Sequence, residues 1–287
     1  MSPDTWRIRA GPLQLSRGLL MGVLNVTPDS FSDGGLYFEE SDAMAAAQAM
    51  VAQGADLIDV GGESTRPGAQ SVDVAEEIRR VLPVIARLAE DGVAVSVDTS
   101  KTSVAREAIA AGASVINDVT GAGSPGMVEL MADSGAGVVV MHMQGTPRDM
   151  QVNPSYDDVV AEVAAWLSER AQTLIDRGIS GESIAVDPGI GFGKTVSHNL
   201  DLLSRLHEIA DLGFPVVLGT SRKSFLGKLT GIEDPARRDE ATAITTAMGF
   251  ERGARIFRVH DVARSRAALG VAAAIVTPQQ WEEWSQG

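Results

Sequence analysis

Short apolar runs alternate with longer amphipathic segments along almost the whole chain. Each run ends at residues that favour turns, such as glycine, aspartate and serine. A continuous apolar run with such an end is typical of a parallel strand buried on both faces. The pattern therefore predicts eight buried strands, which begin near Leu19, Ala55, Val93, Ser114, Gly137, Ser183, Phe214 and Ala254.

The segments between the runs carry apolar residues at helical spacing. Ser41 and Gly54 suit the N-cap and the position just past the end of the first helix. Asp73 and Glu76 have capping-box spacing, and Pro83 should kink or split the helix that begins there. Helices are thus predicted over residues 42–53, from residue 73 onward, and over residues 156–177, 199–212, 237–252 and 262–276.

Eight strands, each followed by a helix, predict an α/β fold, the (β/α)8 TIM barrel, which takes about 250 residues in one domain. A doubly wound sheet is the alternative, but it needs a topological switch point and usually has fewer strands. Residues 1–18 alternate around Gly11-Pro12, which predicts an N-terminal β-hairpin closing the barrel bottom. The barrel is expected over residues 19–277 and an exposed tail over residues 278–287.

The amino-acid composition disfavours several kinds of binding partner and metal site. The 287 residues are 44% hydrophobic, ample for a large core, and carry a net charge of −14 without a Lys/Arg block. We therefore expect neither nucleic acid nor an anionic membrane as a partner. The chain has no cysteine, which excludes disulfides and thiolate metal sites, and its four histidines lack zinc-site spacing.

A secretory signal is the alternative interpretation of the N-terminal region, because Arg7, Arg9 and Arg17 precede an apolar run over residues 19–26. Gly22 and Asn25 interrupt that run, and no small-residue cleavage site follows it. The sequence also has no apolar run of about 18 residues, the length that a membrane-spanning helix needs. We expect a cytoplasmic protein.

Polar side chains at the strand ends are the candidates for chemistry, since a barrel keeps its active site at the carboxyl ends of its strands. Helix caps or loop ties explain some of them, and we expect that role for Ser64, Asp118 and Asp261. Charges beside strand interiors are harder to explain structurally, because unpaired charges are rarely buried. One group of candidates suits the amide, amine and ring-nitrogen edges of a 2-amino-pyrimidinone: Asp98, Asn117, Asp187 and Lys223.

A second group of strand-end residues suits an anion. Arginine and histidine side chains, with loop donors around Ser30 and Ser32, are typical ligands of a phosphate or diphosphate. In a chain of net charge −14, such an anion should also need Mg²⁺, which prefers oxygen ligands. The members of this group are Asn25, Arg66, Arg258 and His260.

A glycine-rich stretch, Gly189 to Thr195, imitates a nucleotide-binding loop. The phosphate-loop pattern requires glycine where Pro188 stands, and the dinucleotide pattern lacks its last glycine in register. We interpret the stretch as a pliable loop that holds Phe192 over the site. His142, at another strand end, is expected to be a loop tie rather than a catalytic group.

Eight motifs, one for each predicted strand, resemble the bacterial dihydropteroate synthase family. The resemblance implies a TIM barrel, usually homodimeric, that condenses 6-hydroxymethyl-7,8-dihydropterin diphosphate with p-aminobenzoate through an SN1-like path. It also implies Mg²⁺. The motifs are LMGVLNVTPDSFSDGG, DVGGESTRPGA, SVDTSK, INDV, MHMQGTP, DPGIGFGKT, SRKSFLG and RVHDV.

The resemblance carries roles over to matching positions. Pterin binding is implied for Asp98, Asn117, Asp187, Lys223, Arg258, Met141 and Gly219. Diphosphate binding is implied for Asn25, Thr65, Arg66, Arg258 and His260, with Asn25 also meeting the metal. Contact with p-aminobenzoate is implied for Phe31, Thr65, Pro67, Phe192, Lys223 and Ser224. Catalytic roles are implied for Asp98, Lys223, Arg66 and Asp33.

Two other functions are compatible with a pterin-binding barrel. One is transfer of a methyl group from a methylated folate to a corrinoid, which needs no diphosphate site. The other is a non-catalytic paralogue, which should have lost loop or SRK residues. The STRPG and RVHD segments and the intact SRK motif favour the synthase over both.

Overall fold

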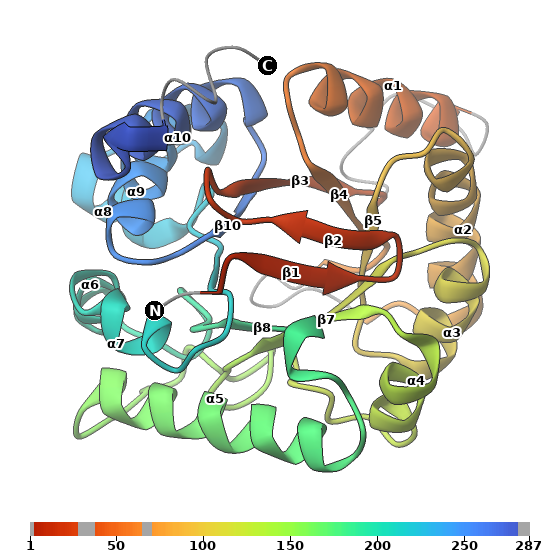
Figure 1. The fold of residues 1–287 in the computed structure, drawn as a ribbon, viewed down its shortest axis with the longest axis horizontal. Coiled ribbons are helices and arrows are strands. Elements are labelled where there is room, and N and C mark those ends of the chain that lie inside the picture. Colours follow the sequence, from red (N-terminus) through yellow and green to blue (C-terminus); the bar gives the residue numbers. More distant parts are fainter. Residues whose placement is uncertain (1–2, 28–37, 65–70, 281–287) are drawn as a thin grey trace.

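The computed structural model describes residues 3–27, 38–64 and 71–280 of the chain (Figure 1). Eight parallel strands form one sheet in the order β8-β7-β6-β5-β4-β3-β10-β9. A parallel bridge between Val186 and Val216 joins the two ends of that order, so the sheet closes into the predicted TIM barrel. The strands are β3 (Leu19–Asn25), β4 (Leu57–Gly61), β5 (Val95–Asp98), β6 (Val115–Asp118), β7 (Gly137–Met141), β8 (Ile184–Asp187), β9 (Val217–Leu218) and β10 (Ile256–Val259).

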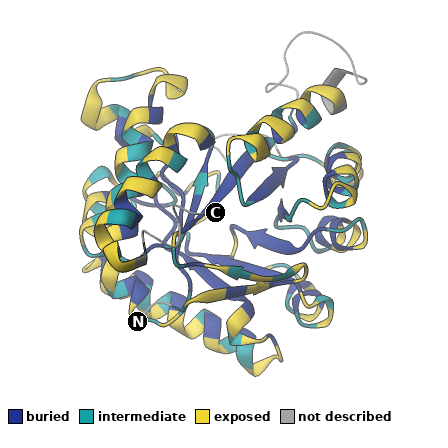
Figure 2. Cartoon of the chain, turned by 45° about the horizontal axis from the view of Figure 1, so that its top comes forward, coloured by how far each residue is buried: buried dark blue, intermediate teal, exposed yellow. Residues whose placement is uncertain are grey.

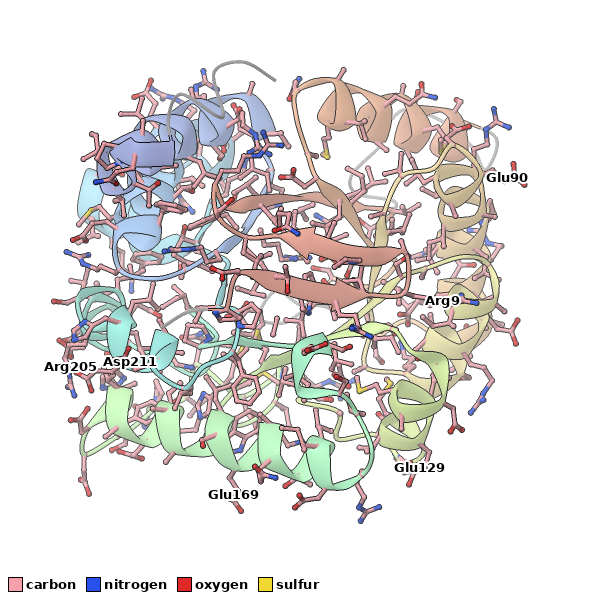
Figure 3. All side chains as sticks on the ribbon, in the orientation of Figure 1. Arg9, Glu90, Glu129, Glu169, Arg205 and Asp211 are labelled. Atoms are coloured by element: carbon pink, nitrogen blue, oxygen red, sulfur yellow. The ribbon has the colours of Figure 1, made fainter. Side chains whose placement is uncertain are left out.

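Helices surround the barrel, and their outward faces are exposed while the strands are buried (Figure 2). The charged side chains of Glu90, Glu129 and Glu169 project outward at the periphery in Figure 3. No helix of the described ranges is long and apolar enough to cross a membrane. The helices are α1 (Phe38–Ala52), α2 (Val74–Glu90), α3 (Thr102–Ala110), α4 (Met127–Ser134), α5 (Val159–Asp176), α6 (Val196–Ser204), α7 (Leu206–Ala210), α8 (Ser224–Thr230), α9 (Asp239–Glu251) and α10 (Val262–Val276).

Helix ends follow some of the sequence signals. Asp73 caps α2 by accepting from the Glu76 amide at 2.9 Å, as predicted. Asp261 caps α10, and Asp118 ties its loop through the Thr120 amide at 2.7 Å, which confirms both expectations. The role expected for Ser64 stays a prediction.

Two helix predictions were wrong, and a third was wrong in part. Helix α1 begins at Phe38, so Ser41 lies inside it rather than at its N-cap. Helix α2 is not split at Pro83, whereas the alternative, a kink at this proline, stays a prediction. The helix predicted over 199–212 is instead two helices, α6 and α7, because Arg205 between them leaves helical geometry with φ −106° and ψ 25°.

The N-terminal hairpin packs against apolar side chains of the barrel strands. Strands β1 (Thr5–Ile8) and β2 (Gly11–Gln14) pair antiparallel, as predicted. Trp6 is fully buried and its Nε1 donates to the Ser183 carbonyl at 2.9 Å. The side chains at this end of the barrel are therefore mainly apolar, and the polar chemistry is expected at the opposite end. The hairpin residues Trp6, Ile8 and Leu15 pack on the inward side chains Leu19, Met21, Leu57, Val115, Val139, Ala185, Val217 and Ile256.

Candidate active site

On several strands, the inward residue two positions after the apolar layer is polar. Side chains alternate between the faces of a strand, so the residue two positions after an inward apolar residue also points inward. A polar layer consequently lies above the apolar one, toward the carboxyl ends of the strands. In this layer Leu57 is followed by Asp59, Val115 by Asn117, Ala185 by Asp187 and Ile256 by Arg258.

Arg258 of β10 connects this layer. Its Nε donates to Asp59 Oδ2 at 2.6 Å and its Nη2 donates to Asp98 Oδ2 at 2.7 Å. Asn117 Nδ2 donates to the same Asp59 oxygen at 3.1 Å. Burial alone would lower the pKa of Arg258, but the attraction of the neighbouring carboxylates raises it above its usual value. The guanidinium therefore stays charged and fixes two carboxylates from neighbouring strands.

Asp98 is a buried carboxyl that titrates near neutrality. Burial raises its pKa from 3.8 to about 7, although attraction to Arg258 opposes that rise. The nearby acidic side chains Asp59 and Glu77 raise the pKa further. Asp98 pairs in register with Asn117 of β6, so the two side chains stand next to each other across adjacent strands.

Lys223 and Asp187 form a second charged group beside Gly219. A Cβ atom placed on Gly219 would lie 3.7 Å from Lys223 Nζ and 3.9 Å from Asp187 Oδ2, so both charged groups lie close to this glycine. Burial lowers the pKa of Lys223 from 10.5 to about 8, against the attraction of Asp187 and Asp98. Burial likewise raises the pKa of Asp187, and Lys223 opposes that rise. Lys223 Nζ also donates to the Ile190 carbonyl.

The backbone next to Lys223 is held in an unusual conformation. Arg222 has φ +60°, in the left-handed region that non-glycine residues rarely adopt. Its guanidinium makes two bonds of 2.8 Å to the Asp239 carboxylate, and Arg238 donates to its carbonyl at 2.9 Å. These contacts hold a strained turn beside a site residue, which is where such strain tends to occur.

The end of β3 and the end of β10 supply the residues suited to an anion. Asn25 ends β3, and a Cβ atom on Gly61 would lie 3.8 Å from its Oδ1 and 3.7 Å from Asp98 Oδ2. His260 follows β10, and its Nδ1 lies 2.8 Å from Ser221 Oγ. Within the described ranges, no group of three or more His, Asp or Glu side chains could hold a metal by itself.

Comparison with known proteins assigns this site to a family. The profile of the pterin binding enzymes matches residues 21–260. The chain belongs to the pterin-binding enzyme family. Within that family, the Escherichia coli K12 dihydropteroate synthase is 45% identical over 269 residues, covering 93% of this chain and 95% of the relative.

Solved structures of the family share the fold. Xanthomonas albilineans dihydropteroate synthase with 4-aminobenzoic acid has a TM-score of 0.87 and 47% identity, over 92% of this chain and 95% of that one. Burkholderia cenocepacia dihydropteroate synthase complexed with 7,8-dihydropteroate has a TM-score of 0.88 and 42% identity, over 98% and 99%. Both likenesses extend over nearly the whole chain, so they apply to the entire barrel.

The structure places most of the residues that the family resemblance singles out at one end of the barrel. Met141 ends β7 in register with Asp187, and Ser224 is the exposed first residue of α8. The Phe192 ring lies over Lys223, with its centroid 4.6 Å from Nζ. Strand ends and the loops just after them carry Asn25, Asp98, Asn117, Met141, Asp187, Gly219, Lys223, Arg258 and His260, whereas Phe31, Asp33, Thr65, Arg66 and Pro67 lie outside the described residues.

The glycine-rich loop after β8 is tied by side chains from several parts of the chain. The pliability expected from its sequence stays a prediction. Gly189 donates its amide to Asp187 Oδ1 at 2.7 Å. The carbonyls of Ile190, Gly191 and Gly193 accept from Lys223, from Gln151 at 2.7 Å and from Tyr156 at 2.9 Å.

Sequence reasoning missed Asp59, Arg222 and Lys194. Asp59 is a fully buried carboxylate inside the apolar run of β4, and it has the same inward parity as Leu57. A charge at an inward position of a buried strand was the signal that could have found it. The left-handed backbone of Arg222 has no local sequence signal. Lys194, only 2% exposed, is the second-last residue of the glycine-rich stretch that resembles nucleotide-binding patterns.

Proposed function

We propose that this chain is a dihydropteroate synthase, which joins 6-hydroxymethyl-7,8-dihydropterin diphosphate to p-aminobenzoate and releases 7,8-dihydropteroate and diphosphate. The observation that carries the proposal is the Arg258 network, because it gathers Asp59, Asp98 and Asn117 from three strands at one end of the barrel. The similarity to dihydropteroate synthases over more than nine-tenths of the chain supports the same reaction.

The proposed pterin site is the polar layer around Arg258. Carboxylates can accept the paired N–H groups of a 2-amino-pyrimidinone, while an amide and an ammonium group can donate to its acceptors. Asp98 and Asp187 would accept, and Asn117 and Lys223 would donate. Arg258 would cover the ring with its planar guanidinium, and Met141 and Gly219 would line the remaining sides.

The proposed leaving-group site adjoins Asp98. Asn25 supplies a polar side chain there, and the family pattern adds Thr65, Arg66 and His260. A magnesium ion held by substrate phosphates needs only one or two protein oxygens, and the Asn25 amide oxygen fits that requirement. When bound, Mg²⁺ would offset the charge of the departing diphosphate.

The reaction that these residues favour breaks the bond between the pterin methylene carbon and a diphosphate oxygen. The electron pair leaves with the diphosphate, and the dihydropterin ring delocalises the positive charge in an SN1-like step. An ionised Asp98 would stabilise this charge. The amine nitrogen of p-aminobenzoate then bonds to the methylene carbon and loses a proton. An aromatic amine is nucleophilic enough to need no strong base, which fits a site without a catalytic triad.

The proposed p-aminobenzoate site lies beside Lys223. Phe192 packs over this lysine, and the exposed Ser224 hydroxyl at the start of α8 suits the carboxylate of the substrate. We assign Phe31, Thr65 and Pro67 to the same site and Asp33 to catalysis from the family pattern alone.

We also propose a homodimer in the cytoplasm. Neighbouring helices α9 and α10 expose large apolar side chains one turn apart, Ile244 and Met248 on one and Val271 and Ile275 on the other, with exposures of 44–74%. Exposed apolar groups of this kind favour association with a second copy. Sedimentation at micromolar concentration tests this, since a monomer there would contradict it.

The proposed reaction is tested by incubating the pure protein with pterin diphosphate, p-aminobenzoate and Mg²⁺ and following diphosphate release and dihydropteroate formation. Both products should appear together and require both substrates. Lys223→Ala is the matched inactive control, because it removes a proposed pterin ligand. Pterin binding without either product would indicate a non-catalytic pterin-binding protein instead.

A further inference from the structure

Lys194 is a buried lysine with three hydrogen-bond acceptors around its ammonium group. Its Nζ lies 3.0 Å from His142 Nδ1, 3.0 Å from the Phe192 carbonyl and 3.4 Å from the His142 carbonyl. An ammonium group has three protons to donate, and here each has an acceptor. Lys194 therefore connects the loop after β8 to the end of β7.

The two segments that Lys194 connects touch through their backbones. A Cβ atom on Gly189 would lie 1.9 Å from the His142 carbonyl oxygen, and one on Gly193 would lie 2.5 Å from the Gln144 carbonyl oxygen. Both glycines also have positive φ values, +67° and +62°. The loop thus lies directly on residues 142–144, and only residues without a side chain fit at these contacts.

His142 is suited to accept from Lys194. Burial, followed by repulsion from Lys194, lowers the pKa of His142 to about 3, so its ring is neutral at neutral pH. Trp166 packs edge-on against the ring with the centroids 5.2 Å apart, and Tyr156 lies at 6.1 Å. These aromatic neighbours fix the orientation of the imidazole, which consequently offers a fixed acceptor.

The charge of Lys194 is also sensitive to its surroundings. Burial lowers its pKa to about 7; attraction to Asp187 opposes this change and repulsion from Lys223 adds to it. Asp187 and Lys223 belong to the proposed pterin site, so the buried ammonium group lies within electrostatic range of that site.

We infer that Lys194 is a positioning residue of the p-aminobenzoate site: it holds the Phe192 carbonyl against His142 and thereby fixes the Phe192 ring over Lys223. This inference rests on the proposed function. Phe192 is half-buried, and its ring makes the cation–π contact with Lys223 at 4.6 Å. Without the ammonium group, the loop would keep its other ties but lose the bond to the residue that bears the ring.

Lys194→Met tests the inference, because methionine keeps most of the side-chain volume and removes all three donated bonds. The KM for p-aminobenzoate should rise about tenfold or more, as expected when a substrate-positioning group is displaced. The kcat and the dissociation constant of the pterin substrate should stay within about threefold of wild type, which separates displaced positioning from general damage. Lys228→Met, at an exposed position of α8, is the control and should change none of these values.

An unchanged KM for p-aminobenzoate in a folded Lys194→Met protein would overturn the inference, and so would equal losses in all three values. Tyr156→Phe removes another bond to the same loop, at Gly193, and should raise the same KM by a smaller factor. If Lys194→Met does not fold, Tyr156→Phe replaces it as the test. An unchanged KM for p-aminobenzoate in Tyr156→Phe would then contradict the inference.

A measurement independent of turnover separates this inference from the proposed reaction. In Lys194→Met, the His142 ring resonances should titrate at a higher pH than in wild type, because the cation that opposes protonation is gone. An unchanged titration would contradict the contact. Absence of product from the wild-type protein would instead contradict the proposed function.

Discussion

Arg258 Nε lies 2.6 Å from Asp59 Oδ2, an ion pair between residues 199 positions apart in the chain. Asp59 is fully buried and belongs to β4, whereas Arg258 belongs to β10; strand β3 lies between them. The pair therefore joins two strands that are not hydrogen-bonded to each other and orients the guanidinium that also holds Asp98. The geometry of the proposed pterin site depends on this contact.

Replacing Asp59 with asparagine keeps the shape of the side chain and removes its charge. Arg258 would lose one of its two carboxylates, and breaking a buried pair costs about 3–5 kcal/mol when one partner is removed outright. Because Asp98 remains, we expect a loss of roughly 2 kcal/mol in the free energy of unfolding and about tenfold weaker pterin binding. Chemical denaturation and titration calorimetry measure the two effects.

The exposed Asp133→Asn variant on α4 is the control for that change. It removes the same charge far from Arg258 and should leave both quantities unchanged. Wild-type pterin affinity in Asp59→Asn would show that the ion pair does not orient the site.

The pH dependence of kcat/KM for the pterin substrate should have two limbs. Asp98 has a pKa raised to about 7 and must be ionised to stabilise the positive ring, so activity should rise with pH through about 7. Lys223 has a pKa lowered to about 8 and must be protonated to donate, so activity should fall as pH rises through about 8.

Initial rates between about pH 5.5 and 9.5 at low pterin concentration measure this profile. Because the groups interact, the limbs report the site as a whole rather than one residue each. The residual activity of Asp98→Asn should lack the acid limb. An acid limb that persists unchanged in that variant would remove Asp98 from the role given to it.

The raised pKa of Asp98 also predicts how stability depends on pH. The folded protein holds this proton up to about pH 7, whereas the unfolded chain releases it near 3.8. The folded state therefore binds more protons in that interval, and the contribution of Asp98 to the free energy of unfolding decreases as pH rises from about 4 to 7. The difference between wild type and Asp98→Asn in urea denaturation should follow this trend; a difference that grows with pH would contradict it.

Arg222→Ala tests the strained turn beside Lys223. Alanine lacks the bonds to Asp239 that hold φ at +60°, so the turn should relax and displace the Lys223 ammonium group. We expect pterin affinity to fall about tenfold to a hundredfold, the usual cost of losing a group that orients a ligand. Arg237→Ala, in an exposed turn nearby, should bind pterin normally. Full affinity in Arg222→Ala would mean that the turn needs no such support.

Arg66→Ala tests the leaving-group assignment, which rests on the family pattern because Arg66 lies outside the described residues. Loss of one preorganised charge at the departing diphosphate should lower kcat on the order of 10²–10³-fold. Binding of a pterin without the diphosphate should change little. Equal losses in both measurements would contradict the assignment.

The sequence was sufficient to predict the barrel, because strands buried on both faces must be apolar and their ends must turn. It was also sufficient to single out Asp98, Asn117 and Asp187 at strand ends and Lys223 in a following loop, where the structure has them, while their roles as pterin ligands stay predictions. The partner of Arg258 could not be found in this way, because no local pattern relates residues 199 positions apart.

Other misses have equally specific causes. The early start of α1 was missed because Ser41 is a good cap but also fits inside a helix, and the cap signal does not say which applies. Lys194 was overlooked because its role depends on the His142 ring, 52 positions away. The contacts of Lys194 and the Asp59–Arg258 ion pair both depend on burial and on pairing between distant segments, which local propensity does not reflect.

The proposed pterin site requires side chains from different strands to meet on a single pterin ring. A crystal structure of the protein with 6-hydroxymethyl-7,8-dihydropterin diphosphate measures this directly. We expect one ring at the carboxyl ends of the strands, within hydrogen-bond distance of Asp98, Asn117, Asp187 and Lys223. A ring bound elsewhere, or one that leaves any two of these four side chains without contact, would contradict it.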